Sequence, residues 1–494
     1  MRFDNMNTEE REDSYSHILK YTGIFGGVQG LNILVGVIRN KFTALFLGPS
    51  GMGLLSLFNS TTNFVASSTN LGIQTSGVKM ISDTMPKECP ASQANAVCMV
   101  RSFSLVAALL GLIVCAVFGP LLNIITFHWG DHTLHFILLA PTVFFTILAG
   151  GETAILKATR QLKALAVQAS LMALLSLLTS VPIYWLWGEK GIIGVLFLTA
   201  FSQWALAFRF SCRIAPLRLR INRRVWLRGI PMLRLGIAFM LASMMNSGAE
   251  FLIRSYLNTR GSLETVGLFN AGITIVIIYA GMIFSVMESD YYPRLSAIRQ
   301  KGEELNTCVN RQLEMNIMLI GPIIIAMIIG LPIIIPLLYN TQFLGMLGMT
   351  QIAALGMLFK AMYLPIEYLP LSCGESKVFL AQESFCVVLL IVCEIVGYKI
   401  GETTGIGCLT GLGGGIVTAY IIEAAAVLAF SRWHYGYHMS KRGATAMLFH
   451  SLCGLLALHT AFTSDHPAAY WTAGVATFLI SLIYSARAIR KSLK

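Results

Sequence analysis

Charged residues are scarce in this chain of 494 residues, making up 12% of it against roughly 25% in soluble domains. Hydrophobic residues make up 55%, and they recur in helix-length runs from one end of the chain to the other. A separate soluble domain has no room in this pattern. The net charge of +12 is compatible with nucleic-acid binding in principle, but its distribution, described below, indicates a membrane topology and no nucleic-acid partner.

The sequence also lacks the signatures of catalytic and cofactor sites. Its ten cysteines include no CxxC pair and no Cys/His cluster, which excludes the usual zinc sites and disulfide frameworks. No Walker A, HExxH or nucleophile-elbow motif occurs. The Gly-Leu-Gly-Gly-Gly stretch at 411–415 has no following Lys and predicts close helix packing. We therefore expect a chain that is not an enzyme and that carries no cofactor or metal.

The N-terminus has no basic segment of the kind that begins a signal peptide. Residues 2–13 are polar and acidic instead, so we expect a tail at 1–17 and a retained first helix.

Apolar runs long enough to cross a bilayer predict about fourteen transmembrane helices. The expected spans are 18–46, 50–73, 98–125, 134–156, 165–187, 191–212, 233–257, 266–289, 314–338, 346–371, 378–398, 405–430, 445–463 and 469–486. Gly- and Pro-containing turns at Gly48-Pro49, Gly130-Asp131, Gly188 to Gly191 and Gly401 mark breaks between them. The fold class is therefore all-α integral membrane.

Lys and Arg orient these spans. With the N-terminus in the cytoplasm, all but seven of the 36 Lys and Arg residues lie in cytoplasmic segments or helix ends. The reverse orientation would place the arginine-rich 213–232 linker outside. We therefore expect cytoplasmic termini, a basic linker at 213–232 resting on anionic lipid, and a short tail at 487–494.

Two similar stretches divide the chain into halves. Residues 38–59 and 253–270 each start with Ile-Arg late in an outward-going helix and end with Gly-Leu…Phe-Asn entering the next one. Repeats six helices apart are related by an axis along the membrane normal. The prediction is an N-lobe at 18–212 and a C-lobe at 233–430 around a central cavity, with an appended helix pair at 445–486.

The second span is unusually polar. Residues 56–76 are rich in hydroxyl and amide side chains, which hydrocarbon cannot accommodate in such numbers. Tight packing explains the Ser and Thr residues, but it explains Asn59, Asn63 and Asn70 poorly. A water-filled cavity between the two halves explains all of them and is the interpretation we favour.

Intramembrane charges are expensive and are kept for pairing or function. Arg39 and Lys41 lie in the outer part of the first span, where they either snorkel outward or face the cavity. Arg254, which matches Arg39 in the repeat, is either paired with Glu250 at i,i+4 or part of a cationic site.

Lys360 and Glu367 lie on one helix face, either as a structural bridge or as a coupling pair, for which Glu250 is also a candidate. The cationic cluster points to an anionic head group, because Arg binds phosphate oxygens bidentately. The expected substrate-binding residues are Arg39, Lys41, Arg254, Asn59, Asn63 and Asn270.

The segment 46–59, the following polar helix and Gly77-Val78-Lys79 resemble the Wzx-type O-antigen and oligosaccharide flippases of the multidrug/oligosaccharidyl-lipid/polysaccharide exporter superfamily. The stretch from Val266 to Ser296 is similar to the seventh and eighth helices of that family.

The resemblance implies an inner-membrane protein with two six-helix lobes and alternating access. It implies transfer of an undecaprenyl-diphosphate-linked oligosaccharide to the periplasmic leaflet, with Arg39, Lys41 and Arg254 among the cavity cations. Membrane lipids, a polysaccharide polymerase and a chain-length regulator are the expected partners.

Two other functions compete with this one. A cation-coupled multidrug exporter of the same superfamily would need a net acidic cavity, whereas the candidates in the first and seventh spans are three cations and one carboxylate. A membrane-embedded glycosyltransferase would need a large loop with paired carboxylates, and the loops here are short. The flippase is therefore the favoured function.

Overall fold

The computed structural model describes residues 8–84, 90–127, 130–219, 223–298, 302–464 and 466–492. Residues 1–7 of the predicted tail lie outside the described residues. Throughout the described ranges the chain is helical and contains no strand, so the prediction of an all-α membrane fold is confirmed. The chain divides into two compact units, residues 1–51 with 57–247 and residues 52–56 with 248–494, which we call unit 1 and unit 2.

Helix α1 (Thr8–Thr69) consists of two helices joined at a kink, where Gly48 adopts φ 63° and ψ −173°. Glycine adopts a positive φ without strain, and the following Pro49 has no N–H for the helical ladder. The predicted break at this point is therefore confirmed, and the two arms of α1 are the first two predicted spans.

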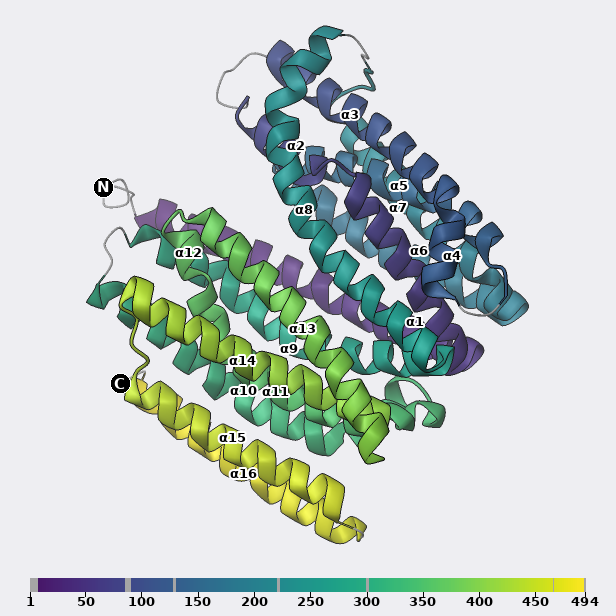
Figure 1. Ribbon diagram of the computed structural model, residues 1–494. Coiled ribbons are helices and arrows are strands. Elements are labelled where there is room, and N and C mark those ends of the chain that lie inside the picture. Colours follow the sequence, from purple (N-terminus) through teal and green to yellow (C-terminus); the bar gives the residue numbers. More distant parts are fainter. Residues whose placement is uncertain are drawn as a thin grey trace. The chain divides into compact units, whose positions relative to one another are not determined.

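Unit 1 is built around α5, which packs against α2, α3 and α7 (Figure 1). Its other helices follow the predicted order. They are α2 (Ile73–Ser82), α3 (Pro90–Val117), α4 (Gly119–Thr126), α5 (Thr133–Ala158), α6 (Leu162–Trp187), η2 (Gly188–Gly191), α7 (Ile192–Cys212) and the first part of α8 (Arg223–Arg260). The short η2 turn separates α6 from α7 where the sequence predicted a break.

Unit 2 contains the remainder of α8 and the rest of the chain. Its helices are α9 (Leu263–Ala297), α10 (Glu303–Leu338), η3 (Thr341–Met346), α11 (Leu347–Glu367), α12 (Leu369–Ser372), α13 (Ser376–Thr404), α14 (Cys408–Tyr435), α15 (Lys441–Thr463) and α16 (Pro467–Ser492). Both α15 and α16, the yellow pair in Figure 1, pack on α10.

Glycines let α13 and α14 approach closely. A Cβ added to Gly397 would lie 2.4 Å from the Gly411 carbonyl oxygen, and one added to Gly415 would lie 2.1 Å from the Cys393 carbonyl oxygen. Small residues at such contacts are typical of helix packing in membranes. The packing role predicted for residues 411–415 is confirmed.

Eleven helices of the described chain are long and apolar enough to cross a membrane. The number is below fourteen because two of them, Gly30–Thr69 and Leu162–Cys212, each join two predicted spans, and the apolar part of α9, Leu263–Ile277, is shorter. Some helices also extend beyond the apolar segments that the sequence predicts: α8 begins at Arg223 and not at 233, and α10 begins at Glu303 and not at 314. Apolar length marks the part in lipid, whereas helix propensity carries the helix further.

Candidate functional site

Arg254 of α8 lies at the centre of a polar cluster in unit 2. Its Nε donates to the Ser56 hydroxyl at 2.9 Å, and its Nη2 donates to the Asn270 Oδ1 at 3.1 Å. Its Nη1 donates to both the carbonyl oxygen of Glu250, at 3.1 Å, and the Glu250 carboxylate, at 3.2 Å. The structure thus brings together three residues that the sequence predicted for the site: Arg254, Asn270 and Glu250.

Arg254 and its carboxylate partner Glu250 differ in exposure. The Arg254 side chain is 13% exposed, whereas that of Glu250 is 60% exposed. Ser56 is held in place by the close approach of Gly53 to α9, where an added Cβ would lie 1.9 Å from the Leu263 carbonyl oxygen. Ser56 and Asn270 therefore fix the orientation of the fork, and the exposed Glu250 is the contact that an incoming anion can replace.

Glu394 of α13 connects this cluster to a second one. Its carboxylate is buried and interacts electrostatically with Arg254, and it also interacts with Tyr420 of α14. The Tyr420 ring lies beneath Lys360, with 5.6 Å between Nζ and the ring centroid. Such a cation–π contact stabilises a buried ammonium group.

Lys360 is surrounded by acidic groups from three helices. Glu367, Glu383 and Glu423 all interact with it electrostatically, Glu367 from the same helix as predicted. Side-chain ligand atoms of Glu367, Cys386 and Glu423 lie within 4.8 Å of one another. We call Glu367, Cys386 and Glu423 the acidic cluster. A carboxylate-rich pocket with one ammonium group can bind a proton or a small cation in the membrane interior.

Arg39 lies in unit 1, where its Nη1 donates to the Ser176 hydroxyl at 3.3 Å. It lines a cavity of about 400 Å³ together with Gln168 and Gln203 of α6 and α7. Within the described residues, the buried Gln168 side-chain oxygen has no hydrogen-bond partner. Lys41 lies about half a helical turn further along α1 and is half-buried. The Arg39 cavity thus combines a largely apolar wall with a few polar side chains, one of which has a hydrogen-bond acceptor to spare.

The polar second arm of α1 uses its two kinds of side chain differently. Thr61, Thr62 and Thr69 are buried and donate to backbone carbonyls of the preceding turn. Asn59 and Asn63 are exposed. Packing therefore accounts for the threonines.

Asn63 and Asn70 line a cavity of about 200 Å³ within unit 1, together with Gln74 and Ser104. Asn70 also accepts a hydrogen bond from the Gly72 N–H at 2.8 Å, which closes the turn between α1 and α2. Two of the three asparagines thus line a small cavity inside unit 1, whereas the predicted water-filled cavity between the two halves stays a prediction.

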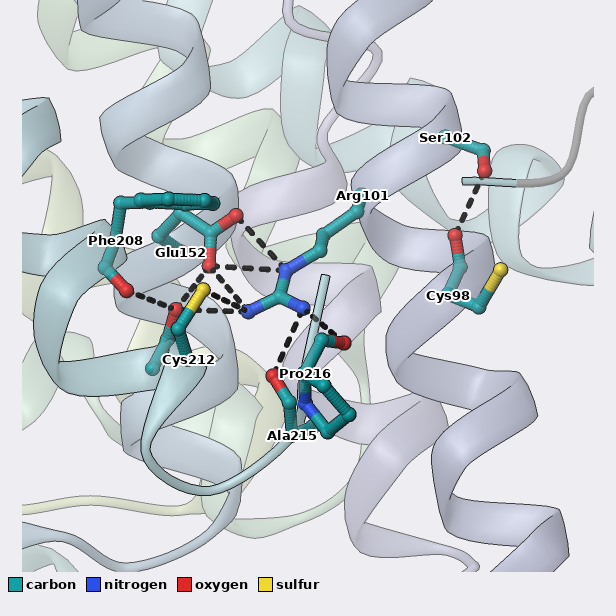
Figure 2. A network of polar contacts seen from close by, with 9 residues as sticks. Cys98, Arg101, Ser102, Glu152, Phe208, Cys212, Ala215 and Pro216 are labelled. Atoms are coloured by element: carbon teal, nitrogen blue, oxygen red, sulfur yellow. Dashed lines mark hydrogen bonds and ion pairs between the residues drawn. The ribbon is translucent and has the colours of Figure 1, made fainter. Parts of the chain in front are cut away.

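Sequence reasoning did not find a third cluster, which Figure 2 shows in unit 1. Arg101 of α3 pairs with Glu152 of α5 at 3.0 Å, and both side chains are under one-tenth exposed. Arg101 also donates to the carbonyl oxygens of Ala215 and Pro216, each at 3.0 Å, and to the Ser211 hydroxyl at 2.9 Å. Every guanidinium donor therefore has a protein acceptor, which indicates a structural role in tying α3, α5 and the end of α7 together.

The sequence alone does not show the importance of four further glutamates, which are Glu152, Glu383, Glu394 and Glu423. All are carboxylates in apolar helices, and their importance depends on partners in other helices. The available signal was the cost of an intramembrane carboxylate, which predicts a partner but does not identify it.

Comparison with known proteins identifies the family and the fold of this chain. A family model described as "Polysaccharide biosynthesis protein" matches residues 43–347, more than half of the chain. A search of curated proteins finds no match. Among solved structures, the lipid II flippase MurJ in an inward closed conformation aligns with 95% of this chain and 99% of its own, at 14% identity and a TM-score of 0.71.

A multidrug resistance MATE family transporter of the MOP superfamily, in an inward-facing conformation, aligns with 82% of this chain and 94% of its own, at 16% identity and a TM-score of 0.63. An outward-facing MATE structure aligns with 84% of this chain and 94% of its own, at 16% identity and a TM-score of 0.56. At these identities the likeness establishes the fold. The chain is a multi-pass membrane protein with the MurJ/MATE transporter fold, and it belongs to the polysaccharide biosynthesis protein family.

Proposed function

We propose that this protein is a flippase that moves an undecaprenyl-diphosphate-linked oligosaccharide, such as an O-antigen or related surface-polysaccharide unit, from the cytoplasmic to the periplasmic leaflet. The family match and the transporter fold support a lipid-linked substrate. We further propose an inner-membrane location with both termini in the cytoplasm, and cooperation with a polysaccharide polymerase and a chain-length regulator.

The observation that carries this proposal is the asymmetric bonding of Arg254. The Glu250 carboxylate is 60% exposed, and i,i+4 pairs in contact with solvent are worth about 0.3–0.5 kcal/mol. A hydrogen bond to a charged group contributes about 1.5–3 kcal/mol, so two phosphate oxygens on one guanidinium edge exceed the pair they replace. Ser56 and Asn270 keep the fork oriented during that exchange.

Arg39, Lys41, Asn59 and Asn63 form the contribution of unit 1 in this proposal. The support is the free hydrogen-bonding capacity of the Arg39 cavity and the exposure of the two amides. Amide groups bind sugar hydroxyls well because each offers both a donor and an acceptor. We assign the arginines to the diphosphate and the asparagines to the glycan.

Coupling to an ion gradient is assigned to Glu250 and the acidic cluster. A diphosphate on Arg254 would displace the Glu250 carboxylate, so substrate binding would free this group from its cationic partner. Glu394 and Tyr420 extend the chain of charged and polar groups to Lys360, Glu367 and Glu423.

A cation-coupled multidrug exporter is the alternative function, and one observation favours it. The three carboxylates around Lys360 form a net acidic centre, which suits an organic cation. In that case Arg254 would have no anionic substrate to bind, and its removal would leave transport intact.

Complementation separates the two functions. In a flippase-null cell that makes the lipid-linked glycan, Arg254→Ala should abolish surface-polysaccharide display and Arg254→Lys should retain little of it, because an ammonium group lacks the planar fork. Arg260→Ala, at the exposed end of the same helix, is the matched control and should display normally.

Protein level in the membrane is measured for each variant. Full display by Arg254→Ala at normal protein level, together with loss of organic-cation resistance in Glu423→Gln, would contradict the flippase function and support the exporter function.

A further inference from the structure

A cavity of about 800 Å³ lies in unit 2, at the end that carries the C-terminus (Figure 1). It is formed where the first part of α10 meets the end of α9, the start of α15 and the end of α16. None of the residues assigned to substrate binding or coupling lines it. The cavity is therefore separate from the residues that we propose for transport.

Basic side chains dominate the lining of this cavity. Arg294, Arg311, Arg442 and Lys491 line it, against the single carboxylate of Glu314. That carboxylate is already engaged, since it accepts a hydrogen bond from the Ser440 hydroxyl at 2.5 Å and lies 3.7 Å from the Arg442 Nε. The cavity thus carries an excess of positive charge that calls for an anion.

The cavity walls are held by buried polar contacts. Asn310 is 8% exposed and accepts hydrogen bonds from the Tyr437 hydroxyl and the Ser440 N–H, each at 2.9 Å. Its own amide donates to the His438 carbonyl oxygen at 2.8 Å. These contacts join α10 to the 436–440 turn, so the wall that carries Arg311 and Arg442 is fixed by buried hydrogen bonds.

The cavity changes character with depth. Met315 and Met318 continue its wall beyond Arg311, and seven residues of helix carry it about 10 Å toward the apolar part of α10. From α16, Ala488 and Ile489 add apolar lining, and further along this helix apolar side chains are exposed, among them Leu482 and Ile483. A soluble anion would use only the basic rim, whereas an amphiphile would use both parts.

We propose that this cavity binds the phosphodiester head group of an anionic phospholipid, with the first part of its acyl chains against Met315, Met318 and the apolar face of α16. Basic pockets between transmembrane helices at the cytoplasmic side suit such head groups. The bound lipid would fasten the appended pair α15–α16 to α10. This proposal does not depend on the flippase assignment.

The test uses the full-length protein in detergent and titrates phosphatidylglycerol, with binding of the first lipid followed by native mass spectrometry. The cavity variant is Arg311→Gln with Lys491→Gln. Both residues are exposed, and neither forms an ion pair within the described residues. The control variant is Arg487→Gln with Arg490→Gln. It removes the same charge from exposed positions of α16 that do not line the cavity.

The dissociation constant should rise about 30-fold in the cavity variant, because each basic residue near an anionic head group contributes roughly a factor of five. It should change less than about threefold in the control variant, and zwitterionic phosphatidylcholine should bind the wild-type protein at least about tenfold more weakly.

Two results would overturn the proposal. Equal weakening in both variants would make the attraction a property of the whole basic end and not of the cavity. Binding of inorganic phosphate as tight as that of phosphatidylglycerol, and lost in the same variant, would make the ligand a soluble anion.

Discussion

Replacing Glu152 with Gln should destabilise the protein far more than the same change at Glu250. Glu152 shares a site with Arg101, whose side chain is 2% exposed and donates to it from Nε and Nη2 (Figure 2). Gln keeps the shape but leaves the guanidinium charge buried without a counter-charge, and breaking a buried pair in this way costs about 3–5 kcal/mol. Glu250 is 60% exposed, so its removal should cost less than about 1 kcal/mol.

The assay is thermal unfolding of the detergent-solubilised protein, followed by the loss of the monodisperse peak in size-exclusion chromatography. For a unit of this size, about 3 kcal/mol corresponds to a fall of roughly 6 °C or more in the midpoint. The double variant Arg101→Met with Glu152→Met removes both charges and should be less destabilised than Glu152→Gln alone, since apolar replacement of a buried pair is often tolerated.

Two outcomes would refute this reasoning. If Glu152→Gln and Glu250→Gln lower the midpoint equally, burial does not decide the strength of these pairs. If the double variant is the worst of the three, then lost packing and the orphaned carbonyls of Ala215 and Pro216 matter more than the unpaired charge.

Further predictions concern the rest of the chain. A cysteine at Asn63 should react with a water-soluble thiol reagent in a cysteine-free background, whereas one at the buried Thr62 should stay inert; equal reactivity would exclude a distinct hydrated face. A reporter fused after Lys494 should be active only in its cytoplasmic form, as the distribution of basic residues predicts. Gly397→Ala should lower thermal stability, because its Cβ would lie 2.4 Å from a carbonyl oxygen of α14. Glu423→Gln should weaken the dependence of transport on the proton or cation gradient while leaving substrate binding intact.

The helical fold could be predicted from the sequence because its determinants are local. A run of about twenty apolar residues is required to cross a bilayer, and glycine or proline marks where a helix kinks or ends. Gly48 and Gly188 both adopt positive φ at breaks that the sequence indicates. The predicted break at Gly401 is displaced, since α13 continues to Thr404 and Gly405 takes the left-handed conformation. Either glycine is a plausible terminator, and tertiary packing decides between them.

The site was only partly predictable. Arg254 lies late in α8 and Asn270 early in α9, within one sequence repeat, so their contact follows from the short connection between these two helices. The contact of Arg254 with Ser56 spans 198 residues and depends on the packing of Gly53 against α9. The acidic cluster joins α11, α13 and α14, and no spacing in the sequence reports such a meeting of three helices.

Three buried or half-buried arginines show how the structure separates structural from functional charge. Arg101 has a protein acceptor for every donor, so a ligand could bind it only by breaking the fold. Arg254 is oriented by neutral partners and neutralised by the exposed Glu250, an arrangement that a phosphate can enter without disturbing the core. Arg39 donates to Ser176 beside a cavity that Gln168 and Gln203 also line. Because all three look alike in the sequence, it is the number and exposure of the acceptors around each guanidinium that gives Arg101 an architectural role and leaves Arg254 and Arg39 as the residues that we propose for substrate binding.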